Sequence, residues 1–151
     1  MMWVVLAWIG LLAPVADDHP RPKPEAVTVT GRVVELTEAL KATGIKADAD
    51  PVAQQVVVVG DDGAITPLLS DEASRALFKD GRLRGRKAEV QGRKFQGVPY
   101  VQVLSFKVED QGTLKTPEYF CDICTISVRD PQPCPCCQAE MVLRFRGDDE
   151  R

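Results

Sequence analysis

All five cysteines of the chain lie in one short segment, between Cys121 and Cys137. So small a segment has almost no apolar core of its own, and its cysteines must therefore supply most of its stability. Two C-x2-C pairs within it form the pattern C-x2-C-x9-C-x2-C. Zn²⁺ takes four ligands in a tetrahedron with Zn–S distances of about 2.3 Å, and one C-x2-C turn can present two of the four sulfurs. We predict a Cys₄ zinc-binding module over residues 117–146, with the ligands Cys121, Cys124, Cys134 and Cys137.

The chemistry of four thiolates favours Zn²⁺, and Cu⁺ and Fe are softer alternatives. Disulfides are the competing interpretation. One bridge stabilises a folded protein by about 2 to 5 kcal/mol, against an apparent 10 to 16 kcal/mol for structural zinc. Five thiols also pair badly. Four protein ligands close the coordination sphere, which favours a structural over a catalytic zinc. Cys136, the fifth cysteine, stays open as a spare thiol, an alternate ligand or a reactive thiol.

The segment Tyr119–Leu143 resembles the small heavy-metal-binding domain of copper-transporting ATPases and metal-efflux adaptors. That pattern opens with aromatic-x-C-x2-H and closes with C-P-x-C and a nearby Met. The matching residues are Tyr119, Cys121, Pro131, Cys134, Pro135 and Cys137. Cys124 stands where that family has His, Thr125 replaces its Pro, and Met141 falls later than its Met. The resemblance implies metal binding, and it keeps a metal carrier or sensor for zinc or copper as an alternative function.

The N-terminus carries an uncharged apolar run, residues 1–16, which the Asp17–Pro20 sequence ends abruptly. A membrane-spanning helix needs about 20 apolar residues, so the run is typical of a signal peptide. No Lys or Arg precedes it, and an uncleaved N-terminal anchor is the alternative. Residues 17–25 are rich in proline and predict an extended linker. We expect an exported protein, periplasmic or secreted, with a membrane tether if the N-terminus is not cleaved.

The middle of the chain shows the period of two that half-buried strands require. From Ala26, valines alternate with polar residues, and Gly31 suggests a bend or bulge. Residues 37–51 read as a polar connection with one helical turn. The later strand over residues 100–109 places Leu104, Phe106 and Val108 on one side. The other expected elements are a hairpin of strands 55–59 and 64–69, a helix 70–78 with Ser70 as N-cap and Gly81 after its end, and a strand 84–92.

This order of strands and one short helix resembles the five-stranded OB barrel, whose helix lies between the third and fourth strands. We therefore predict a mainly β fold, with an OB-like barrel over residues 26–110 followed by the zinc-ribbon module. The resemblance implies a surface for an oligonucleotide or an oligosaccharide. Phe95 and Tyr100 are candidates for stacking on such a ligand.

A basic stretch near the fourth strand makes a polyanion-binding module the second alternative. Its members are Lys79, Arg82, Arg84, Arg86, Lys87, Arg93 and Lys94. We favour a solvated face over a binding site, because aromatic residues are sparse there and the whole chain carries a formal charge of −3. Nucleic acid is thus not the expected partner, and the ligand or protein partner is unknown.

We predict no enzymatic activity. The chain has a single histidine, His19, which lies among the prolines of the linker. The sequence also contains no phosphate-binding glycine loop and no persuasive carboxylate pair.

Overall fold

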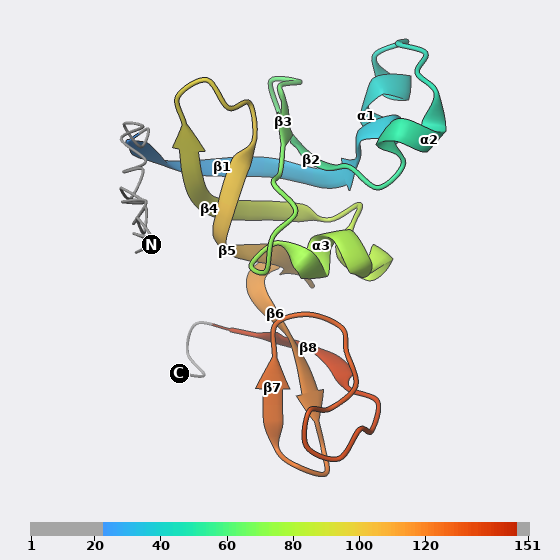
Figure 1. Cartoon of the computed structure of the whole chain (residues 1–151), viewed down its shortest axis with the longest axis vertical. Coiled ribbons are helices and arrows are strands. Elements are labelled where there is room, and N and C mark those ends of the chain that lie inside the picture. The colour runs from blue at the N-terminus through green and yellow to red at the C-terminus, as the bar shows by residue number, and fades with distance from the viewer. Residues whose placement is uncertain (1–22, 148–151) are drawn as a thin grey trace, which may run out of the picture.

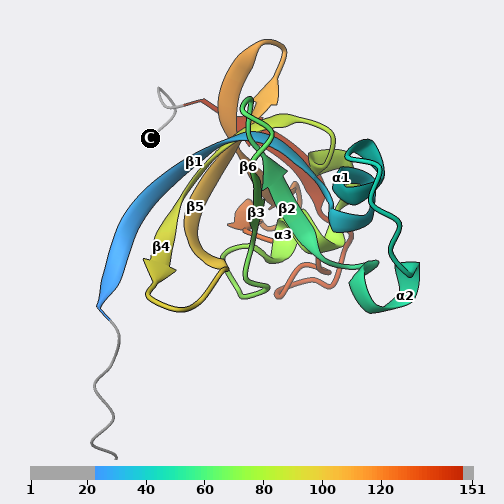
Figure 2. The ribbon, with the colours of Figure 1, turned by 90° about the horizontal axis from the view of Figure 1, so that it is seen from above.

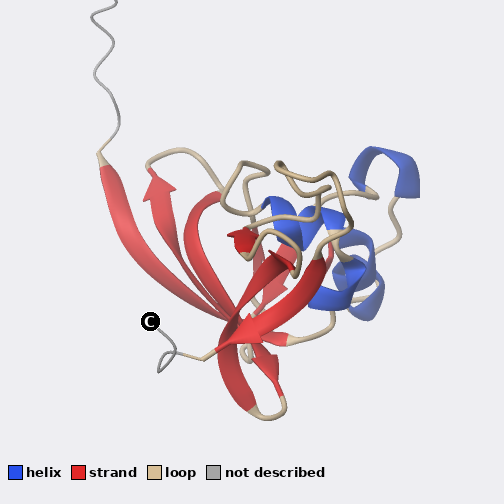
Figure 3. Ribbon diagram, turned by 90° about the horizontal axis from the view of Figure 1, so that it is seen from below, coloured by secondary structure: helices blue, strands red, loops and turns tan. Residues whose placement is uncertain are grey.

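The computed structural model describes residues 23–147, and this part of the chain is mainly β (Figures 1 and 3). Its eight strands belong to one antiparallel sheet with the order β3-β2-β1-β4-β5-β6-β7, and β8 pairs with β6. The strands are β1 (Pro24–Glu35), β2 (Val56–Val59), β3 (Ile65–Pro67), β4 (Lys87–Phe95), β5 (Val101–Asp110), β6 (Thr113–Cys121), β7 (Ile126–Val128) and β8 (Val142–Arg146). The helices are α1 (Leu36–Ala42), α2 (Ala49–Val52), α3 (Arg75–Lys79) and the 3₁₀ turn η1 (Gly81–Leu83).

The predicted mainly β class is confirmed, while the predicted count of five strands and one short helix is too simple. The main sheet is open, and its strands continue past residue 110 into the cysteine-rich segment. The apolar segment 1–16 and most of the linker 17–25 lie outside the described residues, although β1 already begins at Pro24. Within residues 23–147, no helix is long and apolar enough to cross a membrane.

Residues 24–110, here called the N-terminal unit, are organised around the long strand β1. This strand pairs with β4 along most of its length and with β2 at its C-terminal end. Valines recur on the inner faces of these strands because the side-chain period of a strand is two. Val33, Val58 and Val90 are fully buried together with Leu77 of α3. An apolar core of this kind needs no metal to form.

Gly31 causes no bulge, although the sequence suggested a bend or a bulge there. The pairing of β1 with β4 runs through it without a shift, and Gly31 faces Ala88. A Cβ atom at this position would collide with the backbone carbonyl of Val59, the last residue of β2, which pairs with the neighbouring Arg32. Glycine is therefore required here by the close approach of the Val59 backbone.

The register shift lies instead between β4 and β5, where Gln91 pairs with Ser105 and Gly92 pairs with Val103. Leu104 is the extra residue of this β-bulge. Side chains alternate again on each side of it, so Val103 and Phe106 are both buried while Leu104 is 44% exposed. The prediction that Leu104 shares a face with Phe106 is wrong, because one inserted residue reverses the faces of a strand.

The helices also differ from the expectation. The polar connection after β1 contains α1 and α2 rather than a single turn. Helix α3 begins at Arg75, later than the predicted start at Ser70. Asp71 and Ser74 form a reciprocal pair of hydrogen bonds in the turn before it: the Ser74 amide donates to the Asp71 carboxylate (3.1 Å), and the Asp71 amide donates to Ser74 Oγ (2.9 Å). This turn replaces the first turn of the predicted helix.

The β6 strand joins the N-terminal unit to the cysteine module, defined here as residues 113–146. Its first residues pair with β5, from Thr113 opposite Asp110 to Lys115 opposite Val108. Its later residues lie between β7 and β8, where Tyr119 pairs with Val128 on one side and Leu143 on the other. Figure 1 shows this strand running from the upper body of the molecule into the lower one.

Candidate metal centre

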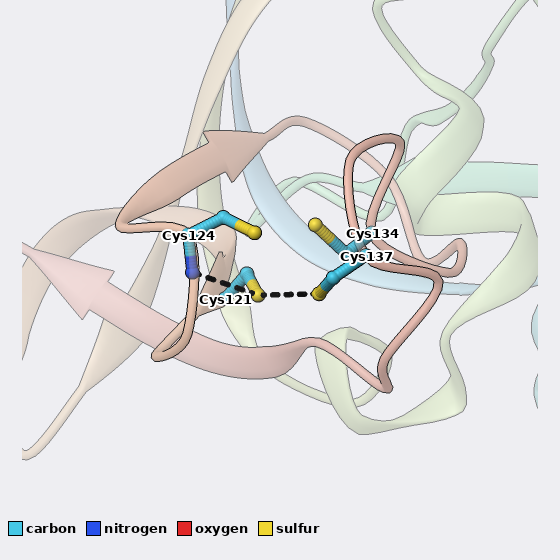
Figure 4. A group of neighbouring side chains, drawn as sticks. All are labelled: Cys121, Cys124, Cys134 and Cys137. Atoms are coloured by element: carbon cyan, nitrogen blue, oxygen red, sulfur yellow. Dashed lines mark hydrogen bonds between the residues drawn. The ribbon is translucent and has the colours of Figure 1, made fainter.

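The structure brings together the four cysteines that the spacing predicted as ligands (Figure 4). Their sulfur atoms all lie within 4.8 Å of one another. Four sulfurs at the corners of a tetrahedron around Zn²⁺ lie about 3.8 Å apart, given a Zn–S distance of about 2.3 Å. The Cys121 and Cys137 sulfurs are 3.6 Å apart, and all five cysteines of the chain are free thiols. The cluster thus has nearly the dimensions of a tetrathiolate metal site.

The first pair of ligands is built on the turn that ends β6. Cys121 is the last residue of the strand and is fully buried, and the Thr125 amide donates to its carbonyl at 2.8 Å. The Cys124 amide points at Cys121 Sγ, with an N–S distance of 3.5 Å. Thr125 has a left-handed backbone with φ of 55°. This conformation reverses the chain immediately after the second cysteine.

The second pair repeats the same turn from a different part of the sequence. The Gln138 amide donates to the carbonyl of Cys134 at 2.9 Å, and Gln138 is left-handed with φ of 62°. The Cys134 amide in turn donates to the carbonyl of Ala139 at 2.8 Å. Each C-x2-C pair is therefore held by a five-residue turn whose last residue is left-handed. Two such turns facing each other place all four sulfurs around one point.

The electrostatics of the cluster differ between the two turns. The pKa of Cys134 is lowered to about 6, first because the backbone amide of Cys137 donates to its sulfur. The pKa of Cys124 is raised, first by the neighbouring thiol of Cys136 and then by that of Cys137. A thiolate is the form that binds a metal. Cys134 is thus prepared as a ligand at neutral pH, whereas Cys124 must give up its proton when a metal binds.

The ligands also differ in their access to solvent. Cys121 and Cys134 are fully buried, Cys124 is half-buried and Cys137 is exposed. Cys136 is exposed as well and lies outside the group of four. The four cysteines of the two C-x2-C pairs therefore form the group, and Cys136 lies beside it, near Cys124.

A buried tyrosine fixes the strand that carries the first ligand. Tyr119, two residues before Cys121, donates its hydroxyl to the Asp80 carboxylate at 2.7 Å. Asp80 is 7% exposed and also accepts from the Arg82 guanidinium at 2.6 and 2.9 Å. This bonding, led by Arg82, lowers the pKa of Asp80 to about 2, while burial and the charge of Asp80 raise the pKa of Tyr119. The network ties β6 to the end of α3 in the N-terminal unit.

A second polar contact fixes the loop between the two cysteine pairs. Asp130 is 6% exposed and lies against α3, 3.2 Å from Lys79 Nζ and 3.7 Å from Arg75 Nη1. The buried side chains Tyr119, Cys121, Cys134 and Met141 belong to the same apolar cluster as the valines of the N-terminal unit. The cysteine cluster is therefore packed against the N-terminal unit.

Most of the predicted basic stretch is already engaged within the chain. Arg82 pairs with Asp80, and Arg84 pairs with Glu35 at 3.2 Å. Arg86 lies 3.5 Å from Asp110 and stacks over the Phe145 ring at 4.9 Å. These contacts hold the ends of strands together and leave a smaller cationic surface than the sequence count indicates.

No protein-family model matches this sequence, and comparisons with curated proteins and with solved structures find no match. The site is therefore understood from its own geometry. Sequence reasoning identified the four sulfurs but missed the supporting residues Asp80 and Asp130. Asp80 lies 39 residues from Tyr119 and Asp130 lies 51 residues from Lys79, so no local pattern signals either contact.

Proposed function

We propose that this protein is an exported, non-enzymatic binding or accessory protein, in which a structural zinc ion orders the cysteine module on an OB-like domain. The observation that carries the proposal is the convergence of four cysteine sulfurs from two matching turns. Two of the four ligands are fully buried, and four thiolates fill a tetrahedral sphere without leaving a position for substrate. The resemblance of the segment to heavy-metal-binding domains adds support for a soft cation.

The OB-like reading of the N-terminal unit rests on the order of its strands. The order β3-β2-β1-β4-β5 is the one an OB barrel requires, and α3 lies between β3 and β4. An isolated parallel bridge links Leu68, just after β3, to Val101 of β5, and the Leu69 amide donates to the Val101 carbonyl at 2.9 Å. This bridge is where such a barrel would close.

The proposal is tested by metal analysis and thiol counting on protein purified without added metal or chelator. We expect about one zinc per chain and five reactive thiols after denaturation. The Cys121→Ser variant should lose the metal, while Cys136→Ser, a matched change outside the group of four, should keep it. Less than half an equivalent of metal together with two disulfides would overturn the assignment.

A metal carrier or sensor is the second candidate, and the exposure of Cys137 favours it. An incoming chelator or partner thiol can reach this ligand first, with Cys136 exposed beside it. The two functions differ in the rate of exchange. A carrier releases zinc to a weak chelator within minutes while the cysteine module stays folded, whereas a structural site releases it only as the module unfolds.

A further inference from the structure

The β4–β5 hairpin and the start of β1 form one end of the molecule. Pro24 pairs with Phe95 and Glu25 with Lys94, so the chain enters the fold directly beside this hairpin. Figure 2 shows β1, β4 and β5 running side by side toward that end. A surface hollow of about 650 Å³ lies there, between the first residues of β1 and the hairpin turn.

The hairpin end combines apolar side chains with unpaired cations. Val98 is 40% exposed at the turn, and Phe95 is partly exposed beside it. Lys23, Arg93 and Lys94 are exposed, and none of the three forms an ion pair within residues 23–147. Glu25 is the one acid among these residues. The arginines at 82, 84 and 86, by contrast, are all paired.

The position of this end relative to the apolar segment 1–16 identifies its partner. Residues 17–22 separate that segment from Lys23, and an extended chain spans at most about 3.6 Å per residue. In a chain that keeps residues 1–16 as a membrane anchor, the hairpin end therefore lies within roughly 25 Å of the bilayer surface. Exposed apolar residues flanked by Lys and Arg are suited to the interface of a bilayer that contains anionic lipid.

We propose that the hairpin end, made of Lys23, Arg93–Lys94 and the turn from Phe95 to Pro99, docks on the surface of an anionic lipid bilayer. The cations contact lipid headgroups, and Phe95 and Val98 enter the interfacial region. The N-terminal unit is then held with β1 pointing at the membrane and the cysteine module away from it. The docking is independent of the metal centre.

The test uses the full chain with vesicles of phosphatidylcholine, with or without phosphatidylglycerol. The only tryptophans are Trp3 and Trp8, so replacing both with Phe makes a new tryptophan the single reporter. Val98→Trp should show blue-shifted emission and quenching by brominated lipid on vesicles with phosphatidylglycerol. Ile45→Trp is the control, because Ile45 is a still more exposed apolar residue (55%) in the α1–α2 loop, away from the hairpin (Figure 1).

Charge removal tests the electrostatic part of the proposal. Each Lys or Arg near an anionic surface strengthens binding roughly fivefold, so Arg93→Gln with Lys94→Gln should lower the docked-to-undocked ratio about 30-fold. The matched pair Lys41→Gln with Lys46→Gln should leave the ratio unchanged. Unchanged quenching in the Arg93/Lys94 variant, or equal quenching of Val98→Trp and Ile45→Trp, would overturn the proposal. Zinc content and the circular dichroism spectrum verify that each variant is folded, and an unchanged zinc content separates this result from failure of the zinc assignment.

Discussion

The N-terminal unit and the cysteine module are stabilised in different ways. The N-terminal unit buries a dense set of valines and leucines, and many of these side chains are completely inaccessible to solvent. Among residues 113–146, the buried apolar side chains are few: Pro117, Tyr119, Cys121, Cys134 and Met141. Two of these five are proposed metal ligands. One sheet thus passes from a region with a dense apolar core into a region where clustered cysteines and polar contacts take the place of such a core.

Removing the metal should have the largest effect, and it should affect the cysteine module alone. With a chelator present, the cysteine module loses an apparent stabilisation of about 10 to 16 kcal/mol, while the core of the N-terminal unit is unaffected. We expect the amides of β7 and β8 to lose protection from hydrogen exchange and those of β1 and β4 to keep it. Peptide-resolved hydrogen exchange with mass spectrometry measures both. Equal protection of β8 in metal-bound and metal-free protein would show that the module does not depend on a metal.

A substitution in the core of the N-terminal unit should have the next largest effect on stability. Leu77 is fully buried, and Leu77→Ala should lower the free energy of unfolding by about 2 to 5 kcal/mol through lost burial and a cavity. Leu104→Ala is the matched control, because Leu104 is 44% exposed at the bulge and should change stability by less than about 0.5 kcal/mol. Urea unfolding of chelator-treated protein measures both values. A similar loss for the two variants would place Leu104 in the core and contradict the described register.

The Tyr119–Asp80–Arg82 network should stabilise the contact between the N-terminal unit and the cysteine module. Tyr119→Phe removes a hydrogen bond to a buried carboxylate and should cost about 1.5 to 3 kcal/mol. The measurement is urea unfolding of the zinc-bound protein at neutral pH. A loss below about 0.5 kcal/mol would mean that the hydroxyl contributes nothing to docking of β6.

The same network predicts a pH dependence with a definite sign. The folded-state pKa of Asp80, about 2, lies below the usual value near 3.9. Its stabilisation is therefore fully present above about pH 4 and is lost as the pH falls from 4 through 2. In chelator-treated protein, the difference in stability between wild type and Asp80→Asn should shrink over this range. A constant difference would exclude Asp80 as the titrating group.

The smallest changes in stability are expected from two acids of the cysteine module, one buried and one exposed. Asp130 is buried between Lys79 and Arg75, and Asp130→Asn should cost about 1 kcal/mol or more. Asp122 pairs with Arg144 at 2.6 Å but is 66% exposed, so Asp122→Asn should cost less than about 0.5 kcal/mol. Thermal unfolding of both variants in low and high salt measures the contrast. The reverse order would mean that the loop contact with α3 does not stabilise the module.

The sequence predicted those features that depend on short-range spacing. The alternation from Val27 to Val33 predicted β1, and the two C-x2-C pairs predicted which sulfurs would converge. The bulge at Leu104 was missed although the apolar alternation changes phase between Val103 and Phe106, because only the pairing with β4 shows that Leu104 is the inserted residue.

The β6 strand was missed for a different reason. Its first residues are polar, and proline at position 117 argues against an inner strand because it cannot donate a ladder hydrogen bond. The buried alternation of Pro117, Tyr119 and Cys121 was the available signal. The contacts of Asp80 and Asp130 depend on how the two regions pack, which no local pattern contains.

The position of β6 between the two regions also sets an order of assembly. Residues 24–110 contain every strand of the N-terminal unit, so this unit can fold as soon as that much chain is free. The first residues of β6 then extend an existing edge at β5, but the second cysteine pair and β8 come later in the chain. Four ligands meet only after the turn at Cys134–Cys137 has formed. In the proposed zinc-bound protein, metal capture is therefore the closing step of folding, because the second pair of ligands is the last to be made.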